Sequence, residues 1–192
     1  MITDKCLADY LSSNSQTRNN NERLLIAEYE GGIDLSLYIS ADVFKHIENT
    51  HPINLIEQGK YSEFCLILEG VSHFLYVVWN ASHYRQVTLL EMELQAEIDK
   101  FILMQSLINH DQDADLINDL RTWLFENNHY DLELETNELE RYERANYYAG
   151  KYCRSLQQKY NLSGLNRVLL NDLRRLYRLG QQDKMRYINK LN

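Results

Sequence analysis

Two glutamates stand where the helical periodicity of residues 87–110 expects apolar side chains. Glu97 falls inside the apolar arc of this predicted helix, and Glu93 lies at the edge of the arc one turn earlier. A carboxylate on an apolar face must be paired, hydrogen-bonded or protonated, because an unpaired buried charge costs several kcal/mol. One interpretation is a structural ion pair of Glu97 with Lys100 or Arg85. The other is a functional polar site built on the two glutamates.

Glu69 and His73 form a second polar group, within the apolar segment of residues 61–80. The pattern predicts two strands joined by a turn at Glu69-Gly70, and the sharp turn would need a positive φ at Gly70. Neighbouring strand residues point to opposite faces, so Ser72 and His73 are not expected to form a nucleophilic pair. A lone histidine in such a position is more often a hydrogen-bonded structural residue than a functional one. If the polar residues form a functional site, the candidate catalytic or ligand-binding residues are Glu69, His73, Glu93 and Glu97.

The sequence contains none of the common metal or nucleotide motifs. The six histidines are dispersed, and no H-E-x-x-H, C-x-x-C, P-loop or G-x-G-x-x-G occurs. Glu69 and His73 are four residues apart, a spacing that would place both on one face of a helix but does not do so in a hairpin. No metal and no cofactor are therefore predicted. The three separated cysteines, Cys6, Cys65 and Cys153, favour a reducing compartment, with Cys153 as a buried structural thiol.

The charge is divided unevenly along the chain. Residues 1–139 hold 8 basic and 24 acidic side chains, whereas residues 140–192 hold 12 basic and 4 acidic ones. Either the basic part packs on the acidic part of the same chain, or it contacts an anionic partner. The candidate partner-binding residues lie on the polar faces of two predicted helices, 138–160 and 165–179. They are Arg144, Lys151, Arg154, Arg167, Arg174 and Arg178.

The elements that position these residues indicate an α+β fold. Strands at 24–30 and 33–40 flank the hairpin signal Gly31-Gly32, and the apolar run at 64–79 is predicted as central strands. Helices follow from residue 87 onward. We expect a small, mostly antiparallel sheet covered by the C-terminal helices. Residues 1–21 are expected to form a mobile segment with a short helix, and 22–192 one domain, strand-rich over 22–86 and helical over 87–192.

The chain has 192 residues, 44% of them hydrophobic, and a pI near 5.2. It begins without a secretory pattern, and its longest apolar runs fall short of the roughly 20 residues of a membrane span. We therefore expect a cytoplasmic protein that does not contact membranes. The favoured function is that of a non-catalytic binding or adaptor protein for an anionic partner. The expected partner is another protein or a second copy of the chain, and a nucleic acid is the other option. The alternative is a small enzyme or small-ligand receptor at the polar residues.

Overall fold

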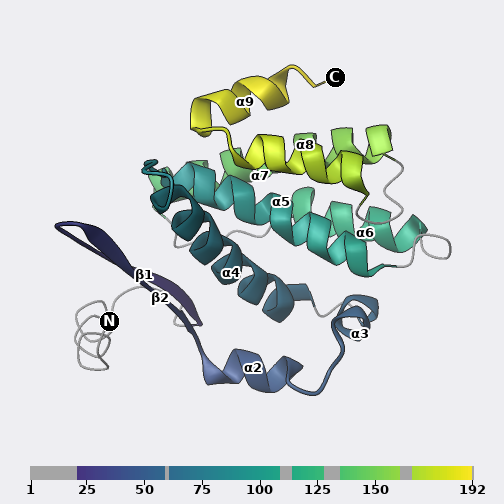
Figure 1. Cartoon of the computed structure of the whole chain (residues 1–192). Helices are drawn as coiled ribbons and strands as arrows, with labels where there is room; N and C mark the ends of the chain where they lie inside the picture. The colour runs from purple at the N-terminus through teal and green to yellow at the C-terminus, as the bar shows by residue number, and fades with distance from the viewer. Residues whose placement is uncertain (1–20, 59–60, 109–113, 128–134, 161–165, 192) are drawn as a thin grey trace.

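The computed structural model describes residues 21–58, 61–108, 114–127, 135–160 and 166–191 (Figure 1). Within these ranges the chain forms one two-stranded antiparallel sheet and eight helices, so the fold is mostly helical. The predicted mobile segment over residues 1–21 falls almost wholly outside them. The elements are β1 Glu22–Tyr29, β2 Gly32–Ile39, α2 Ala41–Ile47, α3 Pro52–Glu57, α4 Tyr61–Ala81, α5 Leu89–Leu107, α6 Ala114–Phe125, α7 Thr136–Tyr160, α8 Arg167–Tyr177 and α9 Gln181–Asn189.

The first hairpin is confirmed, with its turn one residue earlier than predicted. Tyr29 pairs with Gly32, so the turn residues are Glu30 and Gly31, and Gly31 has a φ of 96°. Glycine takes this left-handed conformation without the steric cost that a side chain would bring. The sheet contains no third strand among the described residues.

The predicted strands over 64–79 are wrong, because this segment lies inside the 21-residue helix α4. Gly70 is in the middle of that helix and turns no hairpin. The segment is apolar in every direction, and such a pattern does not distinguish a buried strand from a buried helix. Length separates the two, since an unbroken stretch of 21 residues exceeds an ordinary strand. The region 22–86 is therefore not strand-rich.

Helix α5 occupies the centre of the fold, with α4 on one side and α7 on the other (Figure 1). It is buried around most of its circumference, including several polar side chains. Helix α7 approaches α5 through the small residues Ala145, Ala149 and Cys153, all buried. Small side chains allow close helix contact, and the prediction that Cys153 is a buried thiol is confirmed.

The hairpin packs on α4 and not under the C-terminal helices, which corrects the expected arrangement of the sheet. Gly70 makes this packing possible. A β-carbon at Gly70 would lie 2.8 Å from Oε1 of Glu22 on β1 and 3.0 Å from Cδ1 of Leu37 on β2. The glycine thus brings the hairpin close to the face of α4 that also carries Glu69 and His73.

Helix α4, which was predicted as two short strands, has the length and apolar composition of a membrane-crossing helix. It contacts α5 and both strands of the hairpin, and 39% of its most apolar stretch is buried inside the fold. Core helices of folded proteins share this composition. The expected absence of a membrane contact stays a prediction.

Candidate functional site

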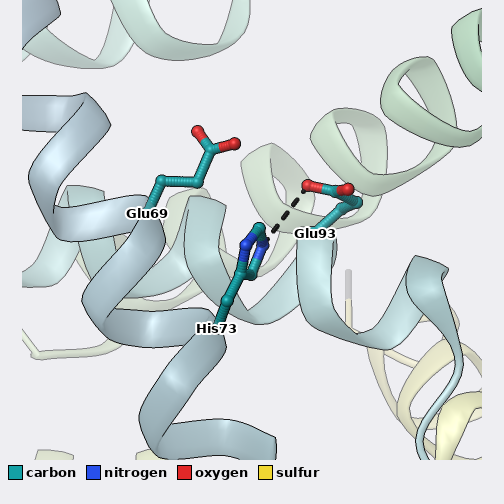
Figure 2. Close-up of side chains that lie close together, drawn as sticks. All are labelled: Glu69, His73 and Glu93. Carbon is teal, nitrogen blue, oxygen red and sulfur yellow. Dashed lines mark ion pairs between the residues drawn. The ribbon is translucent and has the colours of Figure 1, made fainter. Parts of the chain in front are cut away.

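Glu69, His73 and Glu93 meet between α4 and α5 (Figure 2). Because residues four apart share one helix face, α4 presents Glu69 and His73 together, which corrects the expectation based on a hairpin. Glu93 reaches them from α5. One ligand atom from each residue lies within 4.8 Å of the others. The Nε2 of His73 is 3.4 Å from the Oε2 of Glu93 but lacks the alignment of a hydrogen bond.

Glu97 lies beside this group and is paired with Lys100, as one of the two interpretations predicted. The Nζ of Lys100 donates to Oε1 of Glu97 at 2.6 Å and to Oε2 of Glu69 at 3.0 Å. Its side chain is only 8% exposed. Lys100 therefore binds one carboxylate on its own helix and joins α5 to α4 through the carboxylate of Glu69. All four predicted site residues lie close together, and their catalytic role stays a prediction.

Two further charged residues border the group. On α7, the Nε of Arg141 is 3.8 Å from Oε1 of Glu93. On β1, the Oε1 of Glu22 is buried and has no hydrogen-bond partner within the described chain. We call the seven residues together the buried charge cluster. They are Glu22, Glu69, His73, Glu93, Glu97, Lys100 and Arg141.

The cluster shifts the proton affinities of its members. Burial raises the pKa of Glu22 to about 7, against the attraction of His73. Burial alone would lower the pKa of His73, but contact with Glu93 and the charges of Glu69 and Glu22 raise it. Burial also raises the pKa of Glu97, whereas Lys100 and His73 outweigh burial at Glu69 and lower its pKa. Such perturbed groups are more frequent at functional sites than elsewhere.

A second polar network continues along α5, away from His73. Ser72 on α4 donates to Oδ2 of Asp99 at 2.6 Å, and Gln95 donates to Oδ1 of the same carboxylate at 2.8 Å. The Oε1 of Gln95 accepts a 2.8 Å hydrogen bond from Lys184 on α9, whose Nζ also lies over the ring of Tyr76. This network fastens α9 to the core.

Sequence reasoning missed Glu22, Arg141 and Lys184 as parts of these networks. An amphipathic pattern predicts polar residues such as Gln95 and Asp99 on the solvent side of a helix. They are instead covered, because α4, α7 and α9 pack around α5. The segment that follows this helix begins with Asp111, Asp113 and Asp115, so the neighbouring sequence does not indicate that the polar residues of the helix are covered.

The candidate partner-binding residues form two stripes, one on α7 and one on α8. Arg144 and Lys151 of the α7 stripe reach Met185 and Asn189 of α9, and Arg175 of α8 lies over Tyr187 of α9. Helix α9 therefore contacts both helices, and it lies above them in Figure 1. We call the six residues of the stripes the C-terminal basic surface. They are Arg144, Lys151, Arg154, Arg167, Arg174 and Arg178.

No protein-family model matches the chain, and no curated protein or solved structure is significantly similar to it. The interpretation of the two sites therefore depends on their geometry.

Proposed function

We propose that the protein is a binding protein whose C-terminal basic surface contacts an acidic surface of a protein partner. The observation that carries the proposal is that none of the six basic residues forms an ion pair with a carboxylate in the described part of the chain. Five of the six side chains are exposed, and Lys151 is half-buried.

Other basic residues of the same region are neutralised within the chain. Lys159 pairs with Asp172 at 2.7 Å, and Arg186 pairs with Asp183 at 3.2 Å. Within the described residues, the basic part of the chain forms ion pairs with the acidic part through Arg141, which approaches Glu93 and Glu138. The alternative that the basic region packs on the acidic part of its own chain therefore accounts for Arg141 and not for the six. Exposed charges without partners are available to attract an oppositely charged surface.

The neighbours of the basic residues favour a protein partner over a nucleic acid. Tyr147 on α7 is 62% exposed beside Arg144, and Val168 on α8 is 61% exposed beside Arg167. Arginine combined with exposed tyrosine and apolar side chains is typical of protein interfaces. The net charge of −8 of the whole chain opposes any anionic partner at long range, so the preference for a protein depends on these exposed tyrosine and apolar neighbours.

The experiment compares wild type with the triple reversal R167E/R174E/R178E, using fluorescence anisotropy at low salt. The probes are a labelled poly-glutamate peptide and a labelled single-stranded RNA of equal charge. We expect the wild type to bind the peptide more tightly than the RNA, and the triple reversal to lose peptide binding. Sedimentation of the unlabelled protein tests self-association, in which the acidic residues of a second copy would be the partner surface.

The matched control is R167K/R174K/R178K, which keeps the charge and changes only the head group. Binding that is driven by charge survives in this control, whereas binding through bidentate arginine contacts weakens. Equal affinity of wild type and the triple reversal for the peptide would contradict the proposal. Tighter binding of the RNA than of the peptide would replace the protein partner with a nucleic acid.

A further inference from the structure

The group formed by Glu69, His73 and Glu93 has a composition that a simple ion pair does not explain. The side chains of His73 and Glu93 are 9% and 11% exposed, and the His73 Nε2 completes no hydrogen bond. A buried polar atom that completes no hydrogen bond loses its hydration, and at His73 the 3.4 Å approach of Glu93 replaces it only in part. The Glu22 Oε1 is a second such atom, on the side of the group where the hairpin packs.

We propose that Glu69, His73 and Glu93 bind a first-row divalent metal ion between α4 and α5. One imidazole nitrogen and two carboxylate oxygens suit Zn²⁺, Mn²⁺, Fe²⁺ or Co²⁺, since Mg²⁺ and Ca²⁺ prefer ligand sets made of oxygen alone. Ligand atoms within 4.8 Å of one another need only a small change of rotamer to reach a common ion.

The charge of the surroundings supports a bound cation. The buried charge cluster contains four carboxylates, and two of its three basic groups, Lys100 and Arg141, are permanently charged. His73 offsets part of the excess of carboxylates when its ring is protonated, and a divalent ion bound to the neutral ring would supply two positive charges in place of that one.

The neighbouring basic residues, Lys100 and Arg141, do not occupy the oxygen atoms that would bind the metal ion. Lys100 occupies one oxygen of Glu69 and keeps its second bond to Glu97 when the other oxygen turns to a metal ion. The two oxygens of Glu93 face different partners, with Oε2 toward His73 and Oε1 toward Arg141. A metal ion would thus occupy the position between His73 and Glu93, while Lys100 and Arg141 hold the carboxylates in orientation.

Glu69 is the most exposed of the three proposed ligands, with 31% of its side chain accessible. His73 and Glu93 lie deeper, so the ion would be covered after binding. Because the ligands come from two consecutive helices, binding would fasten α4 to α5. A ligand that binds the folded state and not the unfolded state raises the stability of the protein.

Titration of the chelator-treated full chain with CoCl₂ tests this inference by calorimetry and visible absorption. We expect one equivalent to bind with d–d absorption and without the thiolate-to-cobalt band that cysteine ligands would produce. His73→Asn should weaken binding by roughly tenfold or more. His83→Asn is the matched control, because His83 is an exposed histidine just beyond α4, and this variant should bind as wild type does.

Unchanged affinity in His73→Asn, or a thiolate band in the wild type, would overturn the site. If His73→Asn does not fold, a measurement on the wild-type chain tests the proposal in its place. Bound Co²⁺ is paramagnetic and must shift the ring-proton NMR signals of His73 while those of His83 stay in place. Shifts at surface histidines with none at His73 would assign the binding to the surface and overturn the proposal.

Discussion

The Nζ of Lys100 lies 2.6 Å from the Oε1 of Glu97, three residues earlier on α5. This contact explains why a glutamate occupies the apolar arc of that helix. Lys100 is buried and remains charged, since Glu97 and Glu69 outweigh the effect of burial and raise its pKa. The relationship assigns Glu97 a structural partner, while its neighbours Glu69 and His73 are left to face Glu93.

Glu97→Gln should lower the free energy of unfolding by about 1–3 kcal/mol, because the carboxylate that accepts from a buried lysine becomes a neutral amide. Lys100→Met should cost more, about 3–5 kcal/mol, since it leaves two carboxylates without their cation. Urea denaturation measures both. Glu138→Gln is the control, as its partner Arg141 is 3.9 Å away at a more exposed position, and it should change little. Equal stability of wild type and Glu97→Gln would contradict the structural role.

Gly70→Val should destabilise the protein by about 1–3 kcal/mol through overpacking between α4 and the hairpin. The predicted intolerance of Gly70 to substitution therefore stands, but for a reason other than a positive φ. The double variant Gly70→Val/Glu22→Ala should recover part of the loss, because the side chain nearest to the added atoms is shortened. Thermal melting of the two variants and of Glu22→Ala alone measures the coupling. Strictly additive losses would show that Glu22 does not contact residue 70.

Stability should rise with pH above about 7 because of Lys184. Burial lowers its folded-state pKa to about 7, Arg85 lowers it further, and Glu91 and Asp99 raise it. Its ordinary value is 10.5, so between these values the unfolded chain binds more protons, and the free energy of unfolding increases with pH. Lys184→Met should remove this rise. Denaturation at several pH values between about 7 and 9 compares the two slopes, and identical slopes would contradict the assignment.

The sequence was sufficient where the determinants are local. The glycine pair at residues 31–32 indicated the first hairpin, and the Glu97–Lys100 pair was foreseen because three residues on one helix bring the partners together. The segment 64–79 was mistaken for strands because its apolar residues cover every direction of α4. The same error placed Glu69 and His73 apart. It therefore concealed that these two potential metal ligands, four residues apart, share one face of a helix.

Contacts between distant elements could not be predicted. His73 meets Glu93 only because α4 and α5 cross at that level, and Lys184 reaches Gln95 across 89 positions of sequence. The burial of polar residues on α5, such as Gln95, could not be predicted for the same reason. An amphipathic pattern predicts a surface helix, and α5 is enclosed by neighbours that the pattern does not reveal.

The most direct test of the proposed function is to map the contact surface of the unaltered chain by NMR. Amide signals are followed while the poly-glutamate peptide is added at low salt and then while salt is increased. We predict shifts concentrated on α7 and α8 around the C-terminal basic surface, reversed by salt because they arise from charge. Shifts confined to other elements, or no shifts at peptide saturation, would contradict the account.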